Sequence, residues 1–379
     1  MSTDSIPMPA LSFAPALSLL AAFGRVSPAQ PLRTLIRTTG YKLRPPRPLP
    51  HTPFIRKAQD AVLGSGTAGP HQLATLLCEQ RKGGSPTIVL GGFVPDATEQ
   101  VFLLRGSLLS RGSVYYLNYP RNGFSADLLF AQLDDLVHEL VRFHGTPPVV
   151  FSVSFGSGLV LEWLRRTREA GRHAAIAGAI FISPIGCIED LLAPGEAKPA
   201  TLLGRAVKPY LDSADGQVDP RQIEKTRTIF SRMFGAGAQN KATLATLMTA
   251  TELRQLHGAI METIARVDTR GACERMGALR AFSSPSDYFS QRLLPLTEAP
   301  VLILFAEDED AVIDSRSPTR SAFNTAHRAY FPNGTCHTLA NPGGAPVQHA
   351  SLIFHCANFL PPITRFYGAL KTRKFLQVA

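Results

Sequence analysis

Short apolar runs recur along the chain from residue 87 onward, and stretches with helical periodicity separate them. The runs are rich in β-branched and aromatic residues, which favours buried strands. The predicted strands span residues 87–90, 113–119, 148–153, 174–183, 300–306 and 328–331. Predicted helices span 97–111, 126–144 and 159–167, and a last helix begins within 350–360. This alternation indicates an α/β protein with a mostly parallel sheet and helices on both faces.

Two segments depart from this alternation. Residues 43–53 read L-R-P-P-R-P-L-P-H-T-P and should be extended, so residues 1–55 are expected to form a partly proline-rich N-terminal arm. Residues 187–296 have long helical periodicity and no strong strand, which predicts a helical insertion between two core strands. The α/β core would then comprise residues 56–186 and 297–379.

The N-terminal arm contains an apolar stretch, residues 10–23, which includes Pro15 and is too short to span a bilayer. No Lys or Arg precedes it, so it lacks the basic start of a signal peptide. We expect it to pack on the domain as an amphipathic helix, or to make a weak peripheral membrane contact. The second alternative would use the basic residues that follow, namely Arg25, Arg33, Arg37 and Lys42.

Composition narrows the classes of function. Of the 379 residues 45% are hydrophobic and 18% are charged, which is ample for a large buried core. The net charge of +10 comes from scattered Lys and Arg without a zinc-finger or RNA-binding signature, so we expect no nucleic-acid partner. Five cysteines without CxxC spacing favour a reducing compartment, and we expect a cytoplasmic protein. The sequence predicts no oligomeric state.

Residues 151–158, F-S-V-S-F-G-S-G, lie where a predicted strand turns into a helix. Small residues flank Ser154 in this turn and would let it project beyond the carboxyl end of the strand, where a serine can act as a nucleophile. The segment resembles the nucleophile elbow, G-x-S-x-G, of the α/β-hydrolases. Ser152 stands in the place of the first glycine, and Gly156 in the place of the second.

The resemblance to the α/β-hydrolases covers roughly residues 85–365 and implies their fold, with a helical lid in the insertion. The turn L-G-G-F-V-P at 90–95 looks like the family's His-Gly-X turn, with Gly91 in the place of the usual His. By this resemblance, the backbone N–H groups of Phe93 and Phe155 would form an oxyanion hole.

A serine nucleophile needs a base and an orienting carboxylate, and in this family the chain order is serine, acid, histidine. An acidic run follows the predicted strand 300–306. Asp310, with Ile313 three residues later, fits the family's Asp-x-x-Ile pattern best. Asp308 is the second candidate and Glu309 the third.

Two histidines are candidates for the base. His349 immediately precedes the last predicted helix, and the apolar residues after it would anchor it, so we favour it. His337 follows a predicted strand and turn and stays open as the alternative. We expect His355 to be a packing residue, and His327 precedes the last predicted strand, at its wrong end.

The sequence therefore predicts a serine hydrolase that cleaves the carboxylic ester or thioester of a small-molecule acyl substrate through an acyl-enzyme on Ser154. This chemistry requires neither a metal nor an organic cofactor. Residues of the insertion could line an apolar acyl site: Phe230, Met233, Phe234, Leu244, Met248 and Met261. An acyltransferase on the same fold and a non-catalytic binding protein stay open as alternatives, the second because two family motifs are altered.

Overall fold

The computed structural model describes residues 48–196, 198–212, 218–237, 247–289 and 292–378. A sheet of eight strands in the order β1-β2-β4-β3-β5-β6-β7-β8 lies at its centre. The strands are β1 Leu49–Pro50, β2 Thr75–Glu79, β3 Thr87–Leu90, β4 Val114–Asn118, β5 Val149–Val153, β6 Gly178–Ile182, β7 Val301–Ala306 and β8 Gly334–Leu339. In this order, the strands from β4 to β8 run parallel. At the other edge, β2 runs antiparallel to β4, and β1 runs antiparallel to β2. The prediction of a mostly parallel sheet is confirmed.

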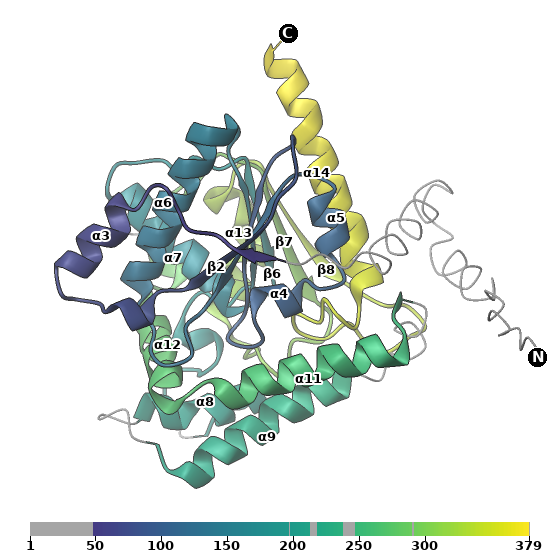
Figure 1. The fold of residues 1–379 in the computed structure, drawn as a ribbon. Coiled ribbons are helices and arrows are strands. Elements are labelled where there is room, and N and C mark those ends of the chain that lie inside the picture. The colour runs from purple at the N-terminus through teal and green to yellow at the C-terminus, as the bar shows by residue number, and fades with distance from the viewer. Residues whose placement is uncertain (1–47, 197, 213–217, 238–246, 290–291, 379) are drawn as a thin grey trace, which may run out of the picture.

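Helices cover both faces of this sheet (Figure 1). One face carries α6 (Ala126–His144) and α7 (Phe155–Glu169), and the other carries α5 (Arg105–Leu109) and α14 (Cys356–Val378). The other helices of the core are α3 Lys57–Gly64, α4 Ala97–Gln100 and α13 Pro318–Tyr330. Every residue of β3, β5, β6 and β7 is buried, because these strands are covered on both sides. This double cover is why their sequences are continuous apolar runs.

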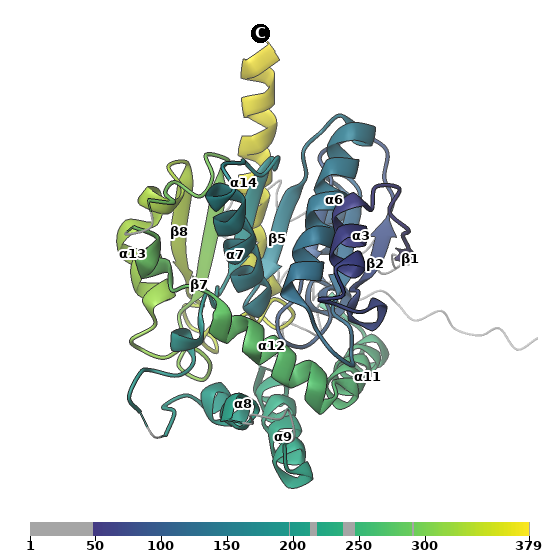
Figure 2. The ribbon, with the colours of Figure 1, turned by 90° about the vertical axis from the view of Figure 1, so that its left-hand side faces the viewer.

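The segment between β6 and β7 forms the helices α8 (Leu202–Asp212), α9 (Pro220–Gly237), α11 (Ala250–Arg266) and α12 (Thr269–Ala281). These helices gather beyond the carboxyl ends of the parallel strands, at the bottom of Figures 1 and 2. The described residues of this segment include no strand. The helices thus cover the edge at which parallel sheets bind ligands.

The N-terminal boundary of the core differs from the prediction. β1 pairs antiparallel with β2, and neither of these two strands was predicted. The N–H groups of Phe54 and Ile55 then donate to the buried carboxylate of Glu139 on α6, at 2.6 and 3.1 Å. Residues 48–55 are therefore part of the core and not of a separate arm, because their backbone bonds attach them to the sheet and to α6.

The rest of the predicted arm, residues 1–47, lies outside the described part of the chain, and so does the apolar stretch 10–23. Among the helices that are described, none combines the length and the apolar character needed to cross a bilayer.

The last strand also differs from the prediction. Residues 328–330 form the end of α13 and Phe331 caps it, so they do not form a strand, and β8 follows them. Pro318 in the first turn and the hydroxyl of Ser317, which accepts the Arg320 N–H at 3.0 Å, start this helix. The strand prediction was wrong because a short apolar run does not distinguish the end of a helix from a strand.

The first turn of α7 is pressed against the segment that follows β6. A Cβ atom at Gly158 would lie 2.1 Å from the carbonyl oxygen of Ile185, so no larger residue fits without movement of the backbone. Gly158 therefore fixes how closely α7 approaches the strand ends.

We expect Gly158→Ala to lower the free energy of unfolding by about 1–3 kcal/mol, because the backbone must move to accommodate the added carbon. Gly277→Ala on α12 is the matched control, since a Cβ at Gly277 meets nothing within 4 Å. The control should leave the free energy unchanged or raise it by up to about 1 kcal/mol, because Ala favours helices. Urea unfolding followed by circular dichroism measures both variants, and equal values would contradict the close approach.

Candidate active site

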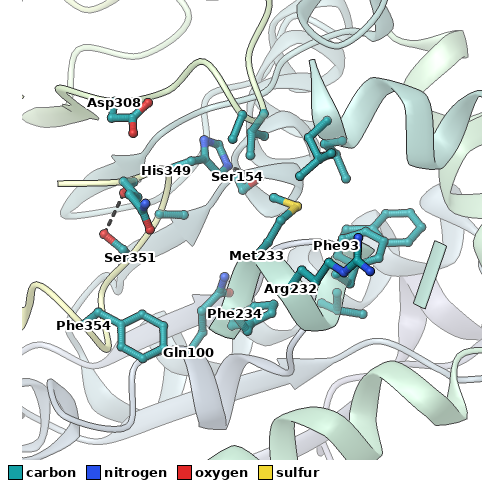
Figure 3. Close-up of a pocket in the computed structure, with 18 residues that line it drawn as sticks. Phe93, Gln100, Ser154, Arg232, Met233, Phe234, Asp308, His349, Ser351 and Phe354 are labelled. Carbon is teal, nitrogen blue, oxygen red and sulfur yellow. Dashed lines mark hydrogen bonds between the residues drawn. The ribbon is translucent and has the colours of Figure 1, made fainter. Parts of the chain in front are cut away.

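Ser154 occupies the turn between β5 and α7, with φ 51° and ψ −117°. A non-glycine residue at such a φ costs on the order of 1–3 kcal/mol, and it persists only where its surroundings hold it. Here the Ser154 N–H donates to the Ile182 carbonyl at 2.8 Å, and the Ser154 carbonyl accepts the N–H of Ser157 at 2.9 Å. These bonds hold the turn so that the Ser154 side chain reaches the pocket beyond the sheet (Figure 3).

Gly156 and Ser152, the small residues on either side of Ser154 in the chain, are accommodated for different reasons. A Cβ at Gly156 would lie 2.3 Å from the carbonyl oxygen of Gly91, so this position requires glycine. Ser152 is fully buried, and its hydroxyl lies 3.2 Å from both the Ile180 carbonyl and the Ser157 hydroxyl. The side chain that replaces the family's first glycine therefore has space and hydrogen-bond partners.

His349 lies beside Ser154 in the loop between β8 and α14 (Figure 3). Its Nε2 is 2.8 Å from Ser154 Oγ, and its Nδ1 is 2.5 Å from Glu309 Oε2. The next residue, Ala350, donates its N–H to the hydroxyl of buried Ser183 at 3.1 Å. This hydrogen bond attaches the histidine loop to the end of β6. The imidazole of His349 lies between the Ser154 hydroxyl and the Glu309 carboxylate.

Glu309 is fully buried in the loop after β7. Its Oε1 accepts the N–H of Ala306 at 2.7 Å, so each carboxylate oxygen has a partner. The adjacent Asp308 donates its N–H to the Val347 carbonyl at 3.0 Å. This backbone bond joins the acidic loop to the histidine loop and sets the distance between them.

The structure does not bring Asp310 to the histidine, contrary to the prediction. The Asp310 side chain is 84% exposed and lies 3.9 Å from Arg320. Asp308 lines the pocket, and Glu309 takes the place beside the imidazole. The Ile313 N–H donates to the Glu309 carbonyl at 2.8 Å, and burial of Ile313 turns Glu309 inward and leaves Asp310 outside.

The structure does not bring His337 to Ser154 either. His337 lies within β8, the edge strand, opposite Leu304 in the register, and its side chain is exposed. His355 is buried, with its Nδ1 2.8 Å from the Ser351 hydroxyl, and burial lowers its pKa. His355 therefore belongs to the packing around the histidine loop.

The two residues predicted to supply oxyanion donors, Phe93 and Phe155, both lie close to Ser154. The turn after β3 passes close by, since a Cβ at Gly92 would be 3.4 Å from the Ser154 Cβ. Phe155 opens α7, and its ring packs on the ring of Phe93 with centroids 5.8 Å apart. Neither the Phe93 N–H nor the Phe155 N–H donates to another residue of the described chain. Both groups can therefore bond an oxygen atom of a ligand.

A pocket of about 300 Å³ opens in front of Ser154 and His349 (Figure 3). Its lining is mainly apolar and includes Phe93, Val94, Leu202, Leu203, Phe230, Met233, Phe234, Val312 and Phe354. Polar lining comes from Gln100, Arg232, Asp308, Gln348 and Ser351. This volume is at the lower end of ordinary ligand pockets, so the space suits a small molecule with an apolar part.

Of the six residues of the insertion that were expected to line an acyl site, the structure describes five, and three of these line the pocket. Phe230, Met233 and Phe234 of α9 line the pocket. Met248 is buried outside the pocket lining, and Met261 lines a separate open groove between α9 and α11. Leu244 lies outside the described residues.

A partly buried charged cluster lies at the start of α4, next to the turn after β3. The Arg121 guanidinium is 2.5 Å from the Asp96 carboxylate. Burial, and secondarily the Asp96 carboxylate, raises the pKa of Glu99 to about 7. The Glu99 carboxylate also accepts the Thr263 hydroxyl of α11 at 3.1 Å, so this cluster links the core to the insertion.

Three residues near the turn after β3 were not found from the sequence: Gln100, Tyr119 and Arg275. They bond the backbone of this turn, but they come from α4, the end of β4 and α12. A sequence signal exists for Arg275 alone, which has helical spacing to the buried Ala272 and Leu279 and so is a cation on an apolar face.

In the described residues, no group of three His, Cys, Asp or Glu side chains could hold a metal ion. Around Ser154, a hydroxyl contacts an imidazole, and the imidazole contacts a carboxylate. Two backbone N–H groups lie nearby. This arrangement can transfer a proton from the hydroxyl to the imidazole while an oxyanion forms.

The chain matches no family model and no curated protein sequence. Among solved structures, it is similar to the esterase RhEst1 from Rhodococcus sp. ECU1013, at 15% identity and a TM-score of 0.50, over 78% of this chain and 96% of the esterase. It is also similar to the esterase EaEST from Exiguobacterium antarcticum, at 12% identity and a TM-score of 0.51, over 78% and 96% of the two chains. Together with the parallel sheet and the turn at Ser154, these similarities show that the chain has the α/β-hydrolase fold.

Proposed function

We propose that this protein is a serine hydrolase that cleaves a carboxylic ester or thioester through an acyl-enzyme on Ser154. The observation that carries the proposal is the continuous chain of contacts from Ser154 Oγ to His349 Nε2 and from His349 Nδ1 to Glu309, at 2.8 and 2.5 Å. The esterases that share the fold support the same class of reaction.

In the acylation step, Ser154 Oγ attacks the carbonyl carbon of the substrate while His349 Nε2 takes the hydroxyl proton. The Glu309 carboxylate accepts the Nδ1–H of His349, which fixes the tautomer and stabilises the imidazolium. The carbonyl oxygen becomes an oxyanion, which the N–H groups of Phe93 and Phe155 bond. When the tetrahedral intermediate collapses, the bond to the leaving group breaks and His349 returns the proton to the departing alcohol or thiol.

In the deacylation step, a water molecule attacks the acyl-enzyme and His349 takes a proton from it. The second tetrahedral intermediate releases the carboxylic acid, and the proton returns to Ser154 Oγ. The same residues would serve an acyltransferase if an alcohol or thiol replaced this water.

The insertion, residues 187–296, acts as a lid on the core, which comprises residues 48–186 and 297–378. Leu202 and Leu203 of α8, together with Phe230, Met233 and Phe234 of α9, supply much of the apolar lining. This lining favours substrates with an apolar acyl part, because removing apolar surface from water stabilises the complex.

We expect Ser154→Ala to lower kcat for p-nitrophenyl butyrate by about 10⁴-fold or more and to abolish labelling by a fluorophosphonate probe. Ser152→Gly is the control, because it keeps the nucleophile and removes only the buried neighbouring hydroxyl. This control should keep its labelling. A well-folded wild type that neither reacts with the probe nor cleaves a panel of esters would favour a non-catalytic binding protein. Products dominated by transfer to an added alcohol or thiol would favour the acyltransferase.

We expect Glu309→Gln to lower kcat by about 10²–10⁴-fold, because the amide no longer stabilises the imidazolium. Asp310→Asn removes one carboxylate from the adjacent, exposed position and should change kcat by less than about twofold, because exposed charges interact weakly. Steady-state ester hydrolysis measures both. A larger loss in Asp310→Asn than in Glu309→Gln would reverse the assignment of the orienting acid.

We expect His349→Asn to slow fluorophosphonate labelling by about 10³-fold or more, because Ser154 then has no base. His337→Asn on the exposed edge strand should label at the wild-type rate. Stopped-flow or gel-based labelling compares the two rates, and slow labelling of His337→Asn alone would identify that histidine as the base.

A further inference from the structure

The proposed oxyanion donor of Phe93 lies between two peptide groups that side chains hold. The first joins Gly91 to Gly92: its carbonyl accepts the Tyr119 hydroxyl at 2.7 Å, and its N–H donates to Gln100 Oε1 at 2.6 Å. The second follows Phe93, and its carbonyl oxygen accepts a guanidinium N–H of Arg275 at 2.6 Å. The peptide that carries the Phe93 N–H is thus fixed from both sides.

Of the three side chains that bond these two peptide groups, only that of Arg275 comes from the insertion. It lies on α12 and is 1% exposed. Its second terminal nitrogen donates to the Pro120 carbonyl at 2.8 Å, on the loop after β4. Its guanidinium also lies over the rings of Phe93 and Tyr119, 5.4 and 5.3 Å from their centroids. One side chain therefore joins α12 to both loops next to the proposed oxyanion hole.

A buried guanidinium is costly unless its environment compensates for the lost hydration. Burial lowers the pKa of Arg275 to about 10, which still leaves the group charged at neutral pH. Two carbonyl oxygens and two aromatic faces compensate, and each interacts with the cation more strongly in a dry site than in water. A hydrophobic residue would pack on the apolar face of α12 without this cost, so the cation needs another explanation.

We propose that Arg275 is a positioning residue: it holds the Phe93 carbonyl so that the preceding N–H faces the oxyanion formed at Ser154. This role rests on the proposed function of the site. Because Arg275 belongs to α12, it also makes the geometry of the oxyanion hole depend on the docked position of the insertion. Arg275 itself does not contact the reacting atoms.

The test replaces Arg275 by Met, which keeps an unbranched apolar side chain, although a shorter one, and removes the donors and the charge. Loss of a complete oxyanion donor costs about 10²–10³-fold in kcat, and a donor that is only loosened should cost about 10–100-fold. We expect this loss in kcat for p-nitrophenyl butyrate with KM changed by less than about threefold, because the donor acts on the transition state and not on the substrate.

A second readout separates positioning from general damage to the structure. A trifluoromethyl ketone forms a tetrahedral adduct with a catalytic serine and places an oxyanion in the hole. Its inhibition constant should rise in Arg275→Met by the same factor by which kcat/KM falls. Titration of active sites with the fluorophosphonate should give the wild-type fraction of reactive serines. Arg280→Met, on the exposed side of the same helix, is the matched control and should change none of these values.

Arg275→Lys keeps the positive charge but has a single donor nitrogen in place of the two that bond the Phe93 and Pro120 carbonyls, and it should recover part of the lost kcat. If Arg275→Met does not fold, the same measurements on Arg275→Lys decide, with a fall in kcat at constant KM as the supporting result. Wild-type kcat in folded Arg275→Met would overturn the positioning role, and if Arg275→Met does not fold, wild-type kcat in Arg275→Lys would overturn it. So would a loss that comes only from fewer reactive serines, each with wild-type turnover. The proposed function is tested separately, by whether Ser154→Ala abolishes the hydrolysis seen in the wild type. If the Arg275 variants contradict the positioning role, the proposed function is therefore unaffected.

Discussion

The strained turn at Ser154 is the constraint on which the rest of the pocket depends. Its positive φ directs the side chain beyond the sheet, and this conformation persists because backbone bonds to β6 and to the first turn of α7 hold it. α7 must also lie very close to the neighbouring loops. Gly156 and Gly158 permit this approach, since a Cβ at either position would overlap a carbonyl oxygen. The strained turn at Ser154 and the two glycines are therefore both needed for α7 to lie this close to the neighbouring loops.

The other groups of the site come from loops that are far apart in the sequence but meet at one edge of the sheet. In a parallel sheet all the carboxyl ends point the same way, so the loops after β3, β5, β7 and β8 converge there. Backbone bonds between these loops, such as the bond from Asp308 to Val347, set the separations between Ser154, Glu309 and His349. The insertion closes the same edge and contributes apolar surface, so the pocket belongs to both parts of the chain.

The interior of the fold could be predicted from the sequence because burial on both faces demands continuous apolar strands. The edge of the sheet could not be predicted, because strands there are not buried on both faces and need no continuous apolar run. β2 lies near the edge and has a weaker apolar pattern, while the two residues of β1 carry no periodicity at all. Tyr330 and Phe331 pack against the core at the end of a helix, which gives this short segment the same composition as a strand. Edge elements are decided by pairing partners and not by their own residues.

At the site, the sequence by itself determined the local features: the turn at Ser154, the glycines beside it and the order of the serine, the acids and the histidines. These features depend on neighbours in the chain, which a sequence displays directly. Only the tertiary structure decided that Glu309 and not Asp310 turns inward, since the direction of a side chain in a loop depends on how that loop closes against others. The same holds for Arg275, whose partners are the carbonyl groups of residues more than 150 positions away. Backbone groups are present at every residue, so no sequence pattern marks which of them a buried cation will bond.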